Sequence, residues 1–448
     1  MSKKLYAPLG HAPPAAQALR SAALRQRWWT ILLVLFTVQF TGAWLFPPAS
    51  ISAFDNLVAT KVGGTPYQLS MWGLIVLAFI VHCRTHGFGK IGSALMLFAP
   101  FWVVGLLAGA FGVDPVKSLR SLTMFALSMA GAALIGIELA PKRAIQTLCW
   151  TLFGIMLAST LLALIVPSIG TQIYGFTTVW RGAFTNKNQL GWIAALTILI
   201  AVAMMRGGAM RLSGITALLA LVCLLASGSK GALVAALVTM AYVYVVSKLA
   251  RHVTTGFGMG VLGFILFVAA IFGFLVLPYA LEALGRDMTL TGRTDVWRIY
   301  FNAMTATPWL GEGPAAYTTI STLTTPLASQ LESLGAIVTP HNTYLGVFGD
   351  TGLFGLVCFL FPMMYLTAMV PLSRPGLLST LCASVGFLML AHGTVETHEV
   401  LAPGPGWFFL MLMWALLQQE KLQARNGAAP APQNITSFDS APMARGIN

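Results

Sequence analysis

Long apolar stretches separated by short polar segments make up most of this chain. A helix that spans a bilayer needs roughly 20 consecutive apolar residues. The sequence holds about twelve such runs, near 29–47, 68–83, 91–110, 119–140, 144–167, 189–205, 212–227, 231–248, 257–278, 342–370, 376–393 and 404–419. This pattern predicts an all-α polytopic membrane protein with about twelve transmembrane helices.

The polar segments divide the chain into five parts. A polar segment (1–28) precedes the first nine runs (29–278), and a long loop (279–341), the last three runs (342–419) and a tail (420–448) follow. We expect the first run to be an uncleaved span and the small, proline-bearing tail to be disordered. The run 342–370 is long and contains Gly349, Asp350, Gly352 and Gly355, which predicts a tilted or broken helix.

The charged residues orient the predicted spans. Lys and Arg recur on alternate short loops, such as 84–90 and 142–143, while most acidic residues fall on the other side. The positive-inside rule therefore places both termini in the cytoplasm and the loop 279–341 outside. The formal net charge of +13 reflects this topology and does not indicate nucleic-acid binding.

Composition agrees with a membrane protein. The chain is 57% hydrophobic and 9% charged, with a mean hydropathy of +0.79, whereas soluble domains carry roughly 25% charged residues. The five cysteines lie in or at the edge of apolar runs, which argues against disulfides and cysteine-based metal sites.

The long external loop is the first candidate for chemistry. Between residues 281 and 339 its cationic side chains are Arg286, Arg293 and Arg298, without any lysine. A guanidinium group can bind a phosphate through two parallel hydrogen bonds. The loop therefore indicates chemistry on a phosphorylated lipid, with Arg293, in a Thr-Gly turn, as the better phosphate ligand.

A short helix is predicted from Asp295 onward. Its apolar face at helical spacing comprises Trp297, Tyr300, Phe301 and Met304. Arg298 lies on the other face, where it either contacts substrate or forms a solvated pair with Asp295 worth under ~1 kcal/mol.

Two further external segments combine glycine with cationic side chains. The first, Arg181–Gly191, includes Lys187 and Asn188, and either Asn186 or Asn188 is expected to cap the helix that follows, which leaves free N–H groups facing an anion. The alternative is a basic loop beside lipid headgroups. The second, Ser227–Gly231, is a tight turn in which Lys230 adds charge to the same anion site, or in which small residues simply permit the turn.

Histidines occur at two external positions. His341 precedes Asn342, which is expected to begin a helix that includes Tyr344, and nearby arginines favour the neutral imidazole that a general base needs. A lone histidine is more often structural. The segment His392–Glu399 allows three interpretations: a metal site, a substrate contact through His398, or a polar turn.

The motifs R-G-A-F-T-N-K-N-Q-L-G, S-G-S-K-G, T-G-R-T-D-V-W-R, G-E-G-P and P-H-N-T-Y-L, in this order over roughly 175–365, resemble those of the O-antigen ligase family. The resemblance implies a GT-C-like glycosyltransferase of the bacterial inner membrane with its active site on the periplasmic face. The implied donor is an undecaprenyl-diphosphate-linked O-antigen, the acceptor is lipid A–core, and membrane lipids surround both.

The resemblance also suggests roles. His341 corresponds to the loop histidine, and Arg181 and Arg293 to the diphosphate-binding arginines, with Lys187, Asn188, Lys230, Arg298, Asn342, Tyr344 and His398 expected to contact substrate. We expect an inverting transfer with no metal and no cofactor. The rivals are an O-antigen polymerase, a protein O-oligosaccharyltransferase and, from another class, a lipid or solute transporter. Superfamily polymerases often have Arg, ten residues, then Gly, but here nine residues separate Arg181 from Gly191.

Overall fold

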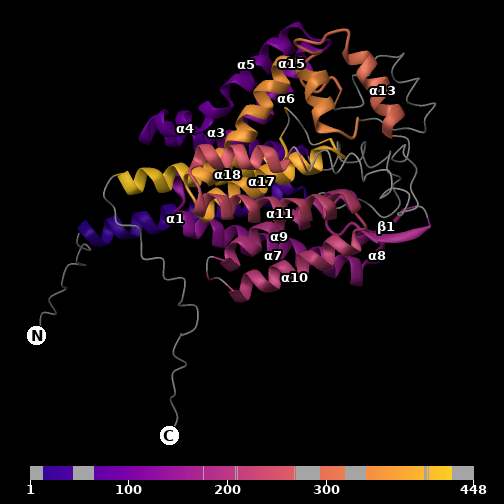
Figure 1. The fold of residues 1–448 in the computed structure, drawn as a ribbon. Coiled ribbons are helices and arrows are strands. Elements are labelled where there is room, and N and C mark those ends of the chain that lie inside the picture. Colours follow the sequence, from indigo (N-terminus) through magenta and orange to yellow (C-terminus); the bar gives the residue numbers. More distant parts are fainter. Residues whose placement is uncertain are drawn as a thin grey trace, which may run out of the picture.

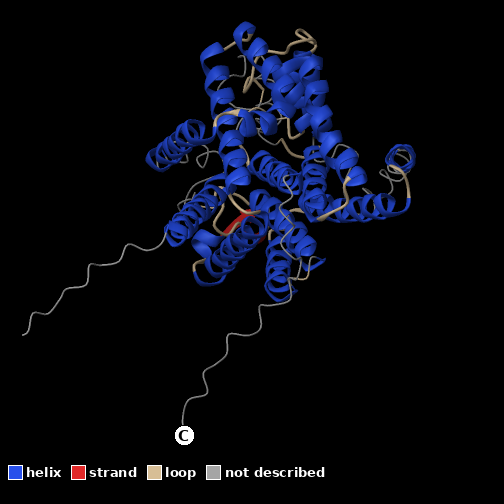
Figure 2. Ribbon diagram, turned by 90° about the vertical axis from the view of Figure 1, so that its left-hand side faces the viewer, coloured by secondary structure: helices blue, strands red, loops and turns tan. Residues whose placement is uncertain are grey.

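The computed structural model describes residues 14–43, 65–268, 293–317 and 340–425, except positions 175, 207, 209, 267, 398–400 and 402. Figure 2 shows that this part is almost entirely helical. The helices before the long loop are α1 (Pro14–Thr41), α3 (Thr65–His86), α4 (Gly89–Leu95), η1 (Met96–Phe98), α5 (Ala99–Phe111), α6 (Pro115–Glu138), α7 (Pro141–Ile165), α8 (Pro167–Gly170), α9 (Lys187–Arg206), α10 (Met210–Ala226), α11 (Lys230–His252) and a helix at Thr255–Leu266.

The remaining helices follow the start of the long loop. They are α13 (Arg293–Met304), α15 (Thr343–Met364), the π-helical η3 (Tyr365–Met369), α16 (Val370–Ser373), α17 (Leu377–Gly393) and α18 (Pro405–Arg425). Every predicted apolar run overlaps a helix, so the all-α polytopic membrane fold is confirmed. Helix α1 begins well before the run predicted from residue 29, within the segment expected to be non-membrane.

Six helical stretches in the described ranges are long and apolar enough to cross a bilayer. They are Gly89–Phe111, Pro115–Glu138, Pro141–Ile165, Lys187–Arg206, Lys230–His252 and Thr343–Ser373. The total of twelve spans stays a prediction.

Helix α18 lies at the centre of the bundle. Every residue from Trp407 to Leu417 is at most 8% exposed, as expected for a helix that is apolar on all sides. The Trp407 ring packs within 5.2 Å of Phe125, 5.8 Å of Phe359 and 6.1 Å of Phe101 between ring centroids. The last helix of the sequence is therefore the core around which α5, α6 and α15 pack.

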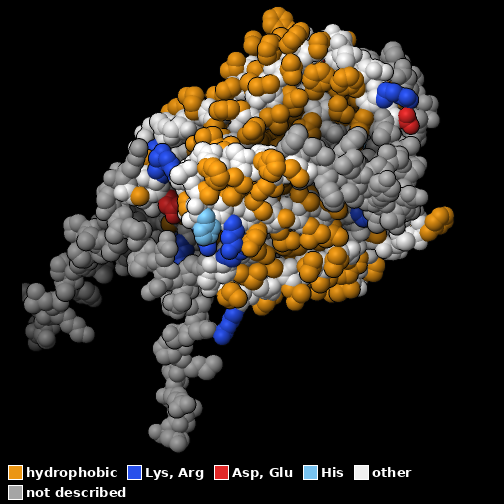
Figure 3. Space-filling view, in the orientation of Figure 1, with side chains coloured by type: hydrophobic (Ala, Val, Ile, Leu, Met, Phe, Trp, Pro, Cys, Tyr) orange, Lys and Arg blue, Asp and Glu red, His pale blue; other side chains and the backbone are white. Residues whose placement is uncertain are grey.

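The outer surface of the bundle is apolar. Figure 3 shows hydrophobic side chains covering most of the described surface between the two ends of the helices. Large side chains such as Leu107, Leu164 and Leu225 are about half exposed or more. A contiguous apolar surface of this extent needs a lipid environment.

A small β-hairpin follows α8, where the sequence predicts an external loop. Strand β1 (Thr171–Tyr174) pairs antiparallel with β2 (Thr177–Trp180), with Thr171 opposite Trp180. The side chains of Ile173, Tyr174 and Phe176 are exposed at its tip. Aromatic and apolar groups at such a position suit a membrane–water interface.

Helix α15 is broken, as the sequence predicts. Gly352 has φ of 65° and ψ of −166°, and a Cβ there would lie 2.2 Å from the carbonyl of Trp309. The long loop passes through this break: Leu353 N–H donates to Pro308 O, and Glu312 N–H donates to Gly349 O. The break thus exposes backbone groups that the loop satisfies.

Asp350 secures the loop inside the break. Its side chain is fully buried and accepts hydrogen bonds from Ala315 N–H (3.0 Å) and Tyr317 N–H (2.8 Å). Ser118 of α6 also donates to Pro314 O at 3.0 Å. The carboxylate that interrupts the apolar run therefore has a structural function, which is to fix the loop against α15 and α6.

We predict that Asp350→Ala lowers the melting temperature of the protein in detergent. The substitution removes the carboxylate that accepts from the buried N–H groups of Ala315 and Tyr317. Each buried donor left without an acceptor costs about 1–3 kcal/mol. Asp295→Ala is the matched control, because Asp295 forms an exposed pair with Arg298. Equal melting temperatures for Asp350→Ala and wild type, by scanning fluorimetry, would contradict this assignment.

Candidate functional site

The polar motifs of the sequence meet at one end of the bundle, here called the loop face. This face comprises the starts of α9, α11 and α15, the end of α17, the hairpin and α13. Figure 1 places α13 and β1 at the same end of the bundle. Segments more than 200 residues apart meet here, since Asn188 of α9 contacts Glu396 after α17.

His341 stands immediately before α15 in a backbone conformation unusual for its type. Its φ is +46°, in the left-handed region that few residues other than glycine adopt. Its neighbour Asn342 is the N-cap, whose side chain accepts from Leu345 N–H at 3.0 Å, so the predicted start of this helix is confirmed. Asn342 also donates through its backbone to Thr397 Oγ1 and through its amide to Thr394 O.

Glu396 is the partner of His341. His341 Nδ1 lies 2.9 Å from Glu396 Oε2, while Glu396 Oε1 accepts from Asn188 Nδ2 at 3.1 Å. Thr343 Oγ1 donates to the backbone oxygen of Glu396 at 2.9 Å. One carboxylate therefore connects α9, the start of α15 and the turn after α17.

The carboxylate contact determines which tautomer of the neutral imidazole fits here. A carboxylate accepts only, so Nδ1 carries the hydrogen in the neutral ring and Nε2 keeps its lone pair. The side chains of His341 and Glu396 are 33% and 18% exposed, so the pair is partly shielded yet accessible. A histidine oriented by a carboxylate has the geometry that a general base requires.

Arg181 has a different setting from the one expected. It is only 4% exposed, and its guanidinium donates to Ile169 O at 2.7 Å and Ser168 O at 3.3 Å. Burial lowers the pKa of Arg181, although a guanidinium stays charged at neutral pH. Its fork here holds the carbonyls of α8, and its contact with a phosphate stays a prediction.

Lysines lie at the starts of two helices on the loop face. Lys187 begins α9, with its Nζ 3.6 Å from the centre of the Tyr174 ring. Asn186 accepts from Gln189 N–H at 2.9 Å, so of the two asparagines it is Asn186 that caps α9. Lys230 is the exposed first residue of α11.

The motifs of α9 and the α10–α11 turn are in close contact. A Cβ on Gly191 would lie 2.5 Å from the Cβ of Ser229 and 3.0 Å from Ser227 Oγ. Only glycine permits this approach of helix and turn. The R-G-A-F-T-N-K-N-Q-L-G and S-G-S-K-G motifs thus form one structural unit.

Helix α13 differs in detail from its prediction. It begins at Arg293, so the expectation that Arg293 precedes the helix is wrong; the side chain of Arg293 lies outside the described part. The buried face comprises Val296, Tyr300 and Met304, whereas Phe301 is 49% exposed. Tyr300 and Met304 of the predicted apolar face are thus buried, and the Phe301 ring stacks on Phe348 of α15 with centroids 6.1 Å apart while it stays half exposed.

The structure shows the hydrogen-bond partners of Trp297, Arg298 and Tyr344. Trp297 Nε1 donates to Pro340 O at 2.8 Å, which connects α13 to the residue before His341. Arg298 pairs with Asp295 at 3.0 Å and is 73% exposed, and Tyr344 donates from its hydroxyl to Leu390 O at 2.8 Å. Arg286 and His398 lie outside the described residues.

Glu396 is the site residue that sequence reasoning did not select. It belongs to the segment His392–Glu399, for which the sequence allowed a metal site, a substrate contact through His398 or a polar turn. His392 is instead buried at 2% exposure, and the Glu396 carboxylate contacts His341 and Asn188. The sequence signal for Glu396 was its position directly after a predicted span. Its partners could not be predicted, because they lie far away in sequence.

Two comparisons with known proteins bear on this face. Residues 215–360 match a family described as O-Antigen ligase, a stretch that includes Lys230, α13 and His341. The chain is also 29% identical over 319 residues to the exopolysaccharide production protein ExoQ of Rhizobium meliloti (strain 1021), covering 67% of this chain and 70% of that protein. The predicted resemblance to the O-antigen ligase family is confirmed, and a polysaccharide-related function is supported.

We predict that Asn342→Ala frays the first turn of α15. Loss of an N-cap side chain costs about 1 kcal/mol, so amide exchange in peptides spanning 342–350 should accelerate roughly fivefold. Hydrogen–deuterium exchange with mass spectrometry measures this directly. Asn302→Ala, on the exposed face of α13, is the control, and exchange of 342–350 unchanged in Asn342→Ala would show that the cap is unimportant.

Proposed function

We propose that this protein transfers a glycan from a polyprenyl diphosphate to a hydroxyl group of an acceptor glycan on the loop face. The observation that carries the proposal is the His341–Glu396 pair at 2.9 Å. The pair supplies an oriented base at the surface of a membrane protein, and His341 lies within the stretch that matches the O-Antigen ligase family. A sugar hydroxyl needs such a base, because its proton must leave as the new bond forms.

The step that these residues serve is a single displacement. The acceptor hydroxyl passes its proton to Nε2 of His341, its oxygen bonds to the anomeric carbon, and the bond from that carbon to the phosphate oxygen breaks. The diphosphate leaves with the electron pair, and the anomeric configuration inverts. Glu396 stabilises the imidazolium that forms, as the carboxylate of a catalytic triad does.

Cationic groups stabilise the departing diphosphate in this proposal. Lys187 and Lys230 begin α9 and α11, where helix N-termini add partial positive charge. Arg181 and Arg293 remain the proposed arginine ligands, and Arg298 a further contact. These charges stabilise the leaving group without a metal.

An apolar groove on the bundle could hold the polyprenyl chain of the proposed donor. It lies between α9, α10 and α11 and is lined by apolar side chains that include Val202, Ala217, Leu221, Leu233 and Leu237. Leu233 is one turn below Lys230. A hydrocarbon chain in this groove would bring its diphosphate to the turn at 227–230.

The acceptor is assigned from the family. We propose lipid A–core, which makes the reaction an O-antigen ligation on the periplasmic face of the inner membrane. The second candidate is polymerisation, in which the acceptor is another lipid-linked glycan; the exopolysaccharide production protein among the relatives favours it. With purified protein and an undecaprenyl-diphosphate glycan, a gel shift of lipid A–core supports ligation, and longer chains on the donor lipid identify a polymerase.

We predict that His341→Ala and Glu396→Gln both reduce transfer. Loss of a general base costs about 10²–10⁴-fold in rate, and Glu396→Gln should lose less than His341→Ala because the imidazole remains. Initial rates of transfer in detergent measure this. His252→Ala, an exposed histidine at the end of α11, is the control, and full activity of His341→Ala would reject the base assignment.

We predict that Ala217→Trp weakens binding of long-chain donors by filling the groove. The ratio kcat/KM for an undecaprenyl donor should fall about tenfold, the equivalent of roughly 1.4 kcal/mol, while that for a short-prenyl donor changes little. Leu225→Trp on the same helix, outside the groove and 57% exposed, is the matched control. Equal losses for both donor lengths would place the polyprenyl chain elsewhere.

A further inference from the structure

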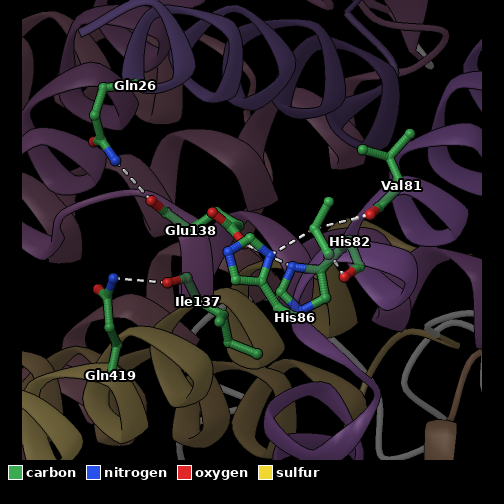
Figure 4. A network of polar contacts seen from close by, with 8 residues as sticks. Gln26, Val81, His82, His86, Ile137, Glu138 and Gln419 are labelled. Atoms are coloured by element: carbon green, nitrogen blue, oxygen red, sulfur yellow. Dashed lines mark hydrogen bonds and ion pairs between the residues drawn. The ribbon is translucent and has the colours of Figure 1, made fainter. Parts of the chain in front are cut away.

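A second cluster of titratable groups, drawn close up in Figure 4, comprises His82, His86 and Glu138 and lies at the opposite end of the bundle from the loop face. His82 and His86 occupy the last turns of α3, and Glu138 is the last residue of α6. One ligand atom from each lies within 4.8 Å of the others. Helix α6 has Ser118, which contacts the loop, near its start, so Glu138 is separated from the loop face by most of that helix.

The three side chains converge on one carboxylate oxygen. His82 Nδ1 lies 2.6 Å and His86 Nδ1 3.7 Å from Glu138 Oε1. Two histidines four residues apart lie on one helix face, and their rings stack with centroids 5.1 Å apart. The His82 and Glu138 side chains are 1% and 11% exposed, whereas that of His86 is 36% exposed, so the cluster opens to solvent on one side.

The backbone that carries Glu138 is held from two other helices. Gln26 of α1 donates to Glu138 O at 2.8 Å and accepts from Ala140 N–H at 3.3 Å. Gln419 of α18 donates to Ile137 O at 2.7 Å. Such outer contacts fix a ligand before anything binds to it, as they do around protein metal sites.

Helix electrostatics favours a cation at this point. Helices α3 and α6 both end here, and a helix C-terminus carries partial negative charge. Glu138 adds a full negative charge at the end where a carboxylate is least favourable. Two negative helix ends and a carboxylate are stabilised by a bound positive ion.

We propose that His82, His86 and Glu138 bind a divalent transition-metal ion of the zinc class, with water completing the coordination. Two imidazoles and one carboxylate are a known zinc ligand set. Ligand atoms around tetrahedral zinc are about 3.3 Å apart. The distance from His86 Nδ1 to Glu138 Oε1 (3.7 Å) is close to this value, and His82 Nδ1, at 2.6 Å, needs to move by less than ~1 Å. The proton that His82 shares with Glu138 leaves to solvent, and the ion joins α3 to α6 independently of glycan transfer.

The test uses the full-length protein in detergent, purified without a polyhistidine tag and freed of metal by a chelator that is then removed. Zn²⁺ is titrated in competition with a chromophoric chelator. Wild type should bind one ion per chain, and His86→Gln and Glu138→Gln should lose about 100-fold or more in affinity. Glu138→Gln keeps a hydrogen-bond acceptor for buried His82, which preserves folding.

His252→Gln is the matched control, because this exposed histidine also ends a helix on that side of the bundle. It and His341→Ala should both bind Zn²⁺ like wild type. Co²⁺ in the site should give the strong visible absorption of four-coordinate cobalt, absent in His86→Gln. Affinity in wild type no tighter than in His86→Gln, or an equal loss in His252→Gln, would overturn the proposal.

Discussion

The arrangement of the loop face depends on the hydrogen bonds of the Glu396 carboxylate. It accepts from Asn188 of α9, faces His341 before α15 and belongs to the turn that ends α17. Three segments that are distant in sequence therefore share one partly buried carboxylate. Because a partly buried carboxylate is costly unless its hydrogen bonds are complete, the same contact that orients the imidazole also holds the helix ends together.

The break in α15 is a second constraint on the position of His341. The break of α15 at Gly352 leaves backbone groups that the loop segment 308–317 satisfies, and buried Asp350 accepts two further N–H groups of that segment. Within the same loop, Trp297 of α13 donates to Pro340 O beside His341. The position of His341 thus depends on the break in α15, where the loop forms the backbone hydrogen bonds that the helix lacks.

The apolar runs predicted the helices well, since burial in lipid demands long apolar segments whose backbone bonds are internal. Asn342 as a helix start and the interruption of the tenth run were also predictable, because both are local signals. The pairing of Glu396 with His341 was not, because it joins residues 55 positions apart. The burial of Arg181 was not predictable either, because its partners are carbonyls of a short helix that the sequence pattern does not reveal.

The buried face of α13 shows where pattern reading fails. The predicted apolar face shares Tyr300 and Met304 with the buried face, but Val296 is buried in place of Trp297, and Phe301 is half exposed. An isolated amphipathic stripe does not specify which of two overlapping faces a neighbour covers. The hairpin at 171–180 was missed because its strands are only four residues each.

The base role of His341 is tested most directly by chemical rescue. Imidazole added to His341→Ala should restore part of the glycan transfer, with a rate that rises with the concentration of neutral imidazole, while wild type is unaffected. Imidazole without effect on His341→Ala, in a variant shown to be folded and to bind donor, would contradict the account.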